Sequence, residues 1–276
     1  MIPMKFDYYR PDTVSEAVEI YGQLDSEGKR PLYYGGGSEI ISMARMNNLD
    51  MGAVIDLKGI QECGELKTDG DHLVIGSSVT LSDITEADLF PLLSKACGRI
   101  ADHTMQCKIT VGGNVCGTII YKEALLPLLL SDCTVLIAGA GHLKKVSINR
   151  LFHQRLNLSP GEFIVQFLVE KKYAALPYFH IKKTKNEKID YPLISLCTVV
   201  DEGKLKLALR GLCEFPFRSV TLEAELNRKG AAMEERVRNA VDLVPGPVLN
   251  DVSGSDRYRL FVLKNTLMNL GKELEG

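Results

Sequence analysis

Two glycine clusters are the part of this sequence best suited to binding a ligand. Residues 35–39 (GGGSE) follow the apolar run at residues 32–34 (LYY), and residues 110–114 (TVGGN) interrupt a second apolar stretch. Glycine lets neighbouring backbone N–H groups turn outward together, and it lets a ligand approach where a Cβ atom would stand. The pair of clusters suits the two phosphates of a dinucleotide. The alternative is that each cluster is a tight turn without a ligand, since glycine is common in turns.

Both clusters resemble the flavin loops of a known protein family. Residues 36–39 (GGSE) resemble its first loop, Gly-Gly-Thr/Ser-Asp, and residues 110–114 resemble its second loop, Thr-Ile-Gly-Gly-Asn. The family is the FAD-binding (medium) subunits of the molybdenum hydroxylases, which includes the flavoproteins of xanthine dehydrogenase and carbon monoxide dehydrogenase. The resemblance runs the whole length of the chain. It implies bound FAD in a flavin domain of the vanillyl-alcohol-oxidase type (FAD-binding PCMH-type).

The resemblance also implies which residues bind FAD. The first cluster donates backbone N–H and hydroxyl groups to the pyrophosphate, and the second cluster holds its other side. Glu123 and Asp132 stand where the family has acids on the ribityl or adenosine side, and Lys182 stands where it has a basic residue near the flavin ring. No catalytic acid or base is required, because the flavin performs the redox step. The implied ligands are Gly35, Gly36, Gly37, Ser38, Glu39, Thr110, Gly112, Gly113, Asn114, Glu123, Asp132 and Lys182.

Structural roles remain open for the acidic members of this set. Glu39 is equally suited to holding the first cluster from behind, and Glu123 and Asp132 are equally suited to capping helices. We expect Gly112 and Gly113 to be the least replaceable residues, with φ > 0 at one of them and a pyrophosphate close to both. The two clusters also favour FAD over FMN, since FMN carries a single phosphate.

The elements that position the clusters follow from the spacing of apolar residues. Thr13 and Glu16 form a capping box at the start of a helix whose apolar face continues to Tyr21. Short apolar runs predict strands, and apolar residues one helical turn apart predict a helix that leads to the second cluster. Strands are predicted at residues 32–34, 53–57, 73–76, 135–138 and 163–169, and helices at residues 92–101 and 125–130.

The C-terminal third of the sequence predicts an antiparallel sheet followed by helices. A charged run at residues 182–188 predicts a solvated loop at a domain junction. Residues 251–259 resemble the family's C-terminal signature, which caps the last of three helices. The other predicted features are strands at residues 193–200 and 205–209, a hairpin turn at residues 201–204, and an apolar helix face of Leu260, Leu263, Leu267 and Leu270.

We therefore predict an α+β fold of two domains, for which 276 residues are enough. Residues 1–172 form the vanillyl-alcohol-oxidase-type FAD-binding domain, with two α/β subdomains at about residues 1–57 and 58–172. Residues 173–276 form a smaller C-terminal flavoprotein domain with an antiparallel sheet and helices. The boundary lies just before the charged run.

Composition excludes several other classes of protein. The net charge of -2 creates no field that would recruit nucleic acid or an anionic membrane. The sequence has neither an apolar run long enough to span a bilayer nor a signal peptide, so we predict a cytoplasmic protein. Seven cysteines without a C-x-x-C argue against a disulfide framework or a zinc ribbon, and most are expected to be buried. The five histidines lack metal-ligand spacing, so we expect no metal on this chain alone.

The resemblance implies an electron-transfer subunit of a multi-subunit molybdenum hydroxylase of the xanthine dehydrogenase type. Electrons would pass from iron–sulfur clusters of a partner subunit through FAD to NAD or another acceptor. The chain lacks the spaced cysteines of iron–sulfur ligation, so an iron–sulfur subunit and a molybdopterin-binding large subunit are the expected partners. One alternative is a stand-alone flavin oxidoreductase. Another is a flavin-depleted assembly module, because Gln106-Cys107 and Ile119 replace the family's Arg-Asn and Asp.

Overall fold

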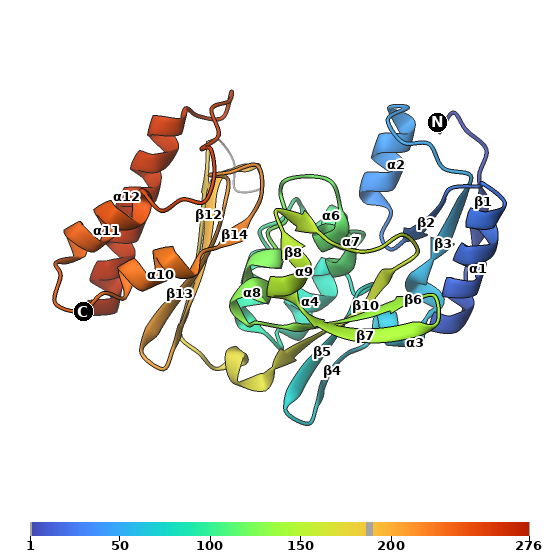
Figure 1. Ribbon diagram of the computed structural model, residues 1–276, viewed down its shortest axis with the longest axis horizontal. Coiled ribbons are helices and arrows are strands. Elements are labelled where there is room, and N and C mark those ends of the chain that lie inside the picture. Colours follow the sequence, from blue (N-terminus) through green and yellow to red (C-terminus); the bar gives the residue numbers. More distant parts are fainter. Residues whose placement is uncertain (1, 186–189, 276) are drawn as a thin grey trace. The chain divides into compact units, whose positions relative to one another are not determined.

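The computed structural model describes residues 2–185 and 190–275, which form two compact units (Figure 1). The first unit comprises residues 1–118 and 131–174, and the second comprises residues 119–130 and 175–276. Helix α8 (Leu125–Leu130), with all six of its residues buried, packs on the sheet of the second unit. The predicted boundary at residue 172/173 left residues 119–130 in the flavin domain, whereas packing groups this segment with the second unit. The predicted α+β fold class is confirmed.

A small parallel sheet begins the first unit. Its strand order is β1 (Asp7–Tyr9), β3 (Ala53–Asp56) and β2 (Pro31–Tyr34). Parallel strands need crossover connections, which helices α1 (Val14–Ser26) and α2 (Ser38–Arg45) supply. As predicted from the sequence, Thr13 is the N-cap of α1, where its side chain accepts a hydrogen bond from the N–H of Glu16. The first glycine cluster lies between β2 and α2.

A five-stranded antiparallel sheet forms the rest of the first unit. Strand β10 (Phe163–Glu170) lies at its centre, between β5 (His72–Gly76) and β6 (Thr134–Gly139). Its position explains why the sequence of β10 is almost continuously apolar, with five consecutive buried residues. The edge strands are β4 (Leu66–Asp69) and β7 (His142–Ser147), and the helices that follow β5 are α4 (Leu81–Ala87), α5 (Pro91–Cys97), α6 (His103–Gln106) and α7 (Val111–Cys116). Shorter elements are η1 (Leu57–Gly59), α3 (Gln61–Gly64), α9 (Ile148–Leu151), β8 (Phe152–His153), β9 (Arg155–Leu156) and η2 (Lys171–Ala174).

The second unit is an antiparallel sheet with helices packed against it. The sheet has the order β11 (Tyr178–Thr184), β12 (Pro192–Asp201), β13 (Lys204–Arg210) and β14 (Phe217–Arg218). The predicted hairpin between β12 and β13 is present, with positive φ at Glu202 and Gly203. Three helices follow, as predicted: α10 (Val220–Leu226), α11 (Met233–Val241) and α12 (Asp256–Glu275). Leu263, Leu267 and Leu270 of α12 are buried in the core of this unit.

The charged run at residues 182–188 is not simply a solvated loop. Residues 182–184 belong to β11, and the side chain of Lys182 is only 1% exposed. Its ammonium group forms an ion pair with Glu123 of the second unit, and this ion pair accounts for the burial of Lys182. The remaining part of the predicted loop, residues 186–188, lies outside the described residues.

All seven cysteines are free thiols, of which Cys107 and Cys116 are exposed and five are buried. Burial raises the pKa of Cys63 to about 12 and that of Cys213 to about 11, so these thiols stay protonated and pack as small apolar groups. The expectation that most cysteines are buried is confirmed. Within residues 2–185 and 190–275, no helix combines the length and apolarity needed to cross a membrane.

Candidate functional site

The first glycine cluster is the turn between β2 and α2. Gly37 is the N-cap of α2 and has φ of 70°, a left-handed conformation that favours glycine. A Cβ atom at Gly37 would lie 2.1 Å from the ring of Tyr34, so space also requires glycine here. The first N–H groups of a helix have no partner within the helix, and a glycine cap supplies no side chain to bind them. The start of α2, at Ser38 and Glu39, is therefore suited to binding a phosphate.

The second glycine cluster forms the start of α7 rather than a loop. Thr110 is the N-cap, and its hydroxyl accepts a hydrogen bond from the N–H of Gly113 at 3.1 Å. The N–H of Gly112 donates to Ser77 O at 2.9 Å, and the N–H of Asn114 donates to Thr110 O at 2.8 Å. These three amides already have partners inside the protein. These amides are bonded without a ligand, and the role of the second cluster in holding the pyrophosphate stays a prediction.

The glycines of α7 serve close packing instead of an unusual backbone conformation. Neither Gly112 nor Gly113 has positive φ, so the expectation of φ > 0 at one of them is wrong. A Cβ atom at Gly112 would lie 2.6 Å from Ser77 O, which is a backbone atom. At Gly113 the nearest atom would be the Thr110 hydroxyl oxygen, at 2.9 Å. Gly112 is therefore the more tightly restricted of the two.

The two clusters contact each other within the first unit. A Cβ atom at Gly36 would lie 1.6 Å from Lys108 O, and one at Gly35 would lie 2.6 Å from the Thr110 hydroxyl oxygen. Glu39 accepts hydrogen bonds from the N–H of Thr118, at 2.7 Å, and from its hydroxyl group. Glu39 thus joins the start of α2 to the segment that follows α7. This contact is the structural role considered for Glu39 from the sequence.

A cation also lies beside the first cluster, and the sequence analysis did not identify it. The ammonium group of Lys58 donates to Gly35 O and to Asp56 Oδ1, each at 2.8 Å. Tyr8 donates a hydrogen bond to Asp56 Oδ2 at 2.5 Å. Burial alone would raise the pKa of Asp56, but the hydrogen bonds from Lys58 and Tyr8 outweigh it and lower that pKa. Lys58 follows Asp56, the last residue of β3, by two positions. This spacing is the sign of the cation that the sequence contains.

A buried hydroxyl group lies next to the second cluster. Ser78 Oγ has no hydrogen-bond partner among the described residues. Its neighbours Ser77 and Val79 bind the N–H groups of Gly112 and Val111 through their carbonyl oxygens, each at 2.9 Å. Buried polar groups are rarely left unpaired, so Ser78 Oγ is available to a bound ligand.

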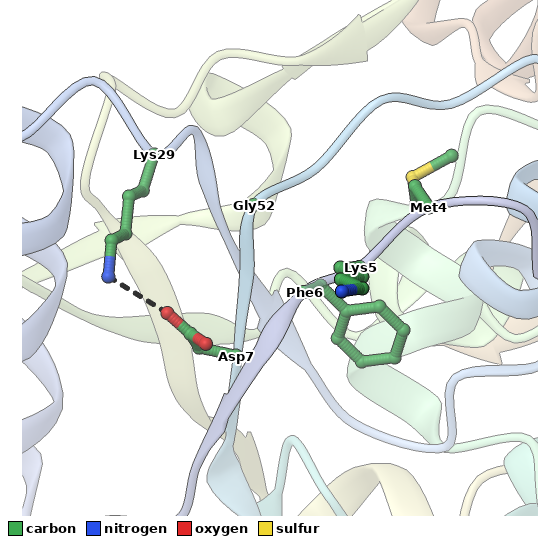
Figure 2. A pocket seen from close by; sticks show the side chains of 6 residues that line it. All are labelled: Met4, Lys5, Phe6, Asp7, Lys29 and Gly52. Atoms are coloured by element: carbon green, nitrogen blue, oxygen red, sulfur yellow. Dashed lines mark hydrogen bonds and ion pairs between the residues drawn. The ribbon is translucent and has the colours of Figure 1, made fainter.

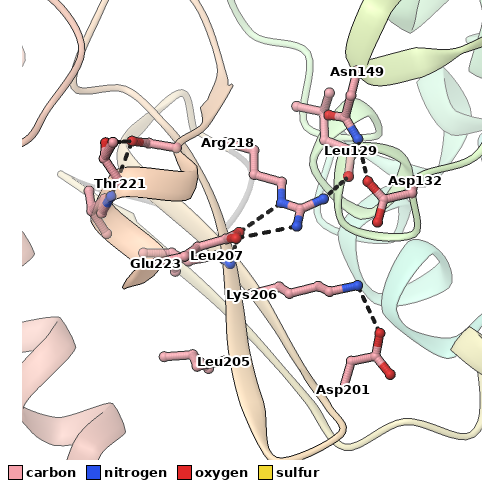
Figure 3. Close-up of polar contacts among 12 residues, drawn as sticks. Leu129, Asp132, Asn149, Asp201, Leu205, Lys206, Leu207, Arg218, Thr221 and Glu223 are labelled. Carbon is pink, nitrogen blue, oxygen red and sulfur yellow. Dashed lines mark hydrogen bonds and ion pairs between the residues drawn. The ribbon is translucent and has the colours of Figure 1, made fainter. Parts of the chain in front are cut away.

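Of the remaining predicted site residues, Glu123 and Lys182 lie together in the second unit. Glu123 accepts hydrogen bonds from Ser195 Oγ at 2.6 Å and from Lys182 Nζ at 3.3 Å. Asp132 belongs to the first unit, where it has φ of 49° and accepts a hydrogen bond from Asn149 Nδ2 at 2.7 Å (Figure 3).

The first unit also has a shallow pocket at the N-terminal side of β1 (Figure 2). Lys29 forms an ion pair with Asp7 there at 2.8 Å. The pocket contains none of the predicted site residues. It is lined by Met4, Lys5, Phe6, Asp7, Lys29 and Gly52. In the part of the chain that the structure describes, no group of three or more His, Cys, Asp or Glu residues is arranged to hold a metal ion.

Residues 4–169 match a family described as the FAD binding domain in molybdopterin dehydrogenase. The chain belongs to this family. It is a FAD-binding medium subunit of the molybdenum hydroxylase family, as the sequence motifs predicted, and its cofactor is FAD.

Relatives of this medium subunit match it along most of its length. The glyceraldehyde dehydrogenase medium chain of Sulfolobus acidocaldarius is 25% identical, covering 99% of this chain and 100% of the relative. Caffeine dehydrogenase subunit beta of a Pseudomonas species is 27% identical over 72% of this chain and 75% of the relative. A carbon monoxide dehydrogenase structure from Hydrogenophaga pseudoflava, lacking the Mo-pyranopterin moiety, has a TM-score of 0.86 at 23% identity, covering 98% and 96% of the two chains. That structural likeness supports the fold.

The residues of this medium subunit fit FAD in three respects. The glycine-capped start of α2 leaves N–H groups for a diphosphate, the Lys58 ammonium group lies beside it, and Ser78 Oγ is a buried hydroxyl without a protein partner. The second cluster packs against the first, because Gly35 and Gly36 lack the Cβ atoms that would otherwise meet Thr110 and Lys108.

Proposed function

We propose that this chain transfers electrons, through FAD, from the iron–sulfur clusters of a partner subunit to a soluble acceptor. A molybdopterin-binding large subunit would oxidise the substrate. The observation that carries the proposal is the first glycine cluster, where Gly37 caps α2 and leaves its first N–H groups for a diphosphate. The names of the relatives support the proposal that this chain is one subunit of a complex, since they describe a medium chain and a beta subunit of dehydrogenases.

Different groups of residues bind different parts of FAD in this proposal. The N–H groups at the start of α2 and the hydroxyl of Ser38 bind the pyrophosphate, and Gly35 and Gly36 allow the second cluster to pack against this turn. Thr110, Gly112, Gly113 and Asn114 hold the other side of the pyrophosphate. Glu39, Glu123, Asp132 and Lys182 are further proposed FAD ligands. Bound FAD supplies the redox chemistry, and the protein fixes its position and excludes side reactions.

We further propose the xanthine dehydrogenase type, with NAD as acceptor. The caffeine dehydrogenase subunit supports this choice, because caffeine is a purine, as xanthine is. The test is to co-express the chain with its iron–sulfur and large subunits, purify the complex and add xanthine. We expect the FAD absorption to bleach and NADH to form when NAD is present. Bleaching by an aldehyde or by carbon monoxide, with no response to xanthine, would contradict the finer proposal and leave the electron-transfer role intact.

The isolated chain gives a simpler test of the cofactor site. We expect the purified protein to show flavin absorption, and heat denaturation to release FAD. Release of FMN would contradict a site built for a diphosphate. Purification of the chain alone with a flavin that a substrate reduces directly would favour the stand-alone oxidoreductase instead.

Replacing Lys58 by methionine should weaken FAD binding. The substitution removes the ammonium group that holds Gly35 O and the positive charge beside the diphosphate. A charge-assisted hydrogen bond contributes about 1.5–3 kcal/mol, and partial exposure of Lys58 reduces this, so we expect a loss of about threefold to tenfold. FAD dissociation constants of the two proteins measure the effect. Lys67→Met is the matched control, because Lys67 is similarly exposed and pairs only locally with Glu65; an equal loss in both variants would rule out a specific role for Lys58.

A further inference from the structure

The second unit contains a buried guanidinium group without a hydrogen-bond partner. Arg210, the last residue of β13, is 1% exposed, and its Nε, Nη1 and Nη2 atoms all lack a partner within the described residues. Arginine is normally buried only when its N–H groups are bonded. Two other arginines of this unit follow that rule. Arg218 binds Glu223 (Figure 3), and Arg259 binds backbone carbonyl oxygens. Arg210 is the exception that needs an explanation.

The charges around Arg210 favour an anion as that explanation. The negative charge of Glu123 raises the pKa of Arg210. Glu123 already accepts hydrogen bonds from Lys182 Nζ and Ser195 Oγ, however. Arg259 adds a further positive charge. Burial lowers the pKa of Arg210 to about 10, which still leaves the guanidinium group protonated at neutral pH. The positive charge of Arg210 is therefore only partly compensated by the protein.

Tyr121 is the aromatic neighbour of Arg210, and its hydroxyl group raises the pKa of the guanidinium group against the effect of burial. The guanidinium carbon lies 4.1 Å from the centre of the Tyr121 ring, a cation–π contact that uses the flat face of the guanidinium group. The Tyr121 ring in turn stacks on Tyr191, with ring centres 4.1 Å apart. Tyr191 is 58% exposed, so this stack runs from the buried arginine to the surface of the second unit.

We propose that Arg210 is the anchor of an oxyanion-binding site in the second unit. The guanidinium group binds two oxygen atoms of a phosphate or carboxylate, Tyr121 holds it from one face, and Lys182 adds positive charge. The oxyanion is either a free small anion or a phosphate of a dinucleotide acceptor. The site does not involve the first glycine cluster.

Thermal unfolding of the full-length protein tests this site. Phosphate replaces chloride at constant ionic strength, and we expect it to raise the unfolding temperature of the native protein by about 5 °C at saturating concentrations. Arg210→Met removes the charge and keeps the volume. This variant should unfold at a higher temperature than the native protein in chloride, because no buried charge is left uncompensated. Phosphate should shift it at least several-fold less than the native protein, which also corrects for the general stabilising effect of phosphate.

Arg218→Met is the matched control. Arg218 is also a buried arginine of this unit, but it donates to Glu223 Oε1 at 2.7 Å, so its loss should lower the unfolding temperature and leave the phosphate response intact. A second arm replaces phosphate with NADH, and a response to NADH alone would identify a dinucleotide as the source of the oxyanion. The proposal is overturned if the native protein responds to neither ligand, or if Arg210→Met responds as the native protein does. If Arg210→Met does not fold, Arg210→Lys takes its place, and an unchanged response to phosphate in that variant would equally overturn the bidentate site.

Discussion

Replacing Gly36 by valine is expected to abolish FAD binding. A Cβ atom at this position would lie 1.6 Å from Lys108 O and 2.8 Å from the carbonyl carbon of the same residue. Both are backbone atoms, so the clash cannot be relieved by a side-chain movement, and the first cluster must separate from the residues ahead of α7. The N–H groups at the start of α2 would then lose their positions. Each lost charge-assisted hydrogen bond contributes about 1.5–3 kcal/mol, so affinity should fall by at least about 100-fold.

The FAD content of the purified Gly36→Val protein, together with titration of its apoprotein, measures this effect. Gly22→Ala is the control, because a Cβ atom there meets nothing within 4 Å and alanine favours the helix. Gly113→Ala should lie between the two, since only the Thr110 hydroxyl group is close. A Gly36→Val protein that purifies with its full FAD content would show that the contact between the clusters is unnecessary for binding.

Replacing Arg259 by leucine is expected to destabilise the second unit strongly. The buried guanidinium group of Arg259 donates to Leu193 O at 2.6 Å, to Gly211 O at 2.5 Å and to Asp251 Oδ1 at 2.7 Å. It thereby joins β12 and the end of β13 to the turn before α12. Without it, the carbonyl oxygens of Leu193 and Gly211 each lose a donor, and Asp251 loses its ion-pair partner. We expect the free energy of unfolding to fall by about 3–5 kcal/mol.

Urea unfolding followed by circular dichroism measures this loss, and Arg257→Leu serves as the control. Arg257 is exposed two residues away, so its replacement should change the free energy of unfolding by about 0.5 kcal/mol or less. The effect of Arg259→Leu should also depend on pH. Burial alone would raise the pKa of Asp251, but hydrogen bonds from the N–H of Ser253 and from Arg259 lower it. The part of the stabilisation that comes from Asp251 is therefore present above the ordinary pKa of aspartate and is lost as the pH falls through the lowered one. The difference between the two proteins should shrink in acid, and the part that comes from the carbonyl contacts should remain. An undiminished difference in acid would exclude this linkage.

The fold was largely predictable because its signals are local. The buried runs of β10 and β12, the helix at residues 125–130, the hairpin between β12 and β13 and the leucine face of α12 all follow from the spacing of apolar residues. Residues three or four apart meet on a helix, and alternate residues share a face of a strand, whatever the rest of the chain does. The glycine clusters were also recognisable from the sequence, since their spacing and neighbours resemble one family's flavin loops.

The prediction for α7 failed because tertiary contacts outweighed its weak helix propensity. Two adjacent glycines favour a loop. The side chain of Thr110 and the carbonyl oxygen of Ser77 nevertheless bind the amides of Gly113 and Gly112, and so fix a helical turn. The same contacts bond these amides without a ligand. Ser77 is 35 residues away from Gly112 in the sequence, and no local pattern reveals such a partner.

Tertiary structure alone decided how the charged side chains are used. Lys58 meets Gly35 O because β2 and β3 are parallel neighbours, and Glu39 reaches Thr118 across 79 residues. Lys182 is buried because it pairs with the buried carboxylate of Glu123, whereas Arg210 is buried with its N–H groups unbonded among the described residues. The sequence does not distinguish a charged residue that is solvated from one that is paired or one that binds a ligand. Its free energy depends on the groups that packing brings to it, and those groups come from distant parts of the chain.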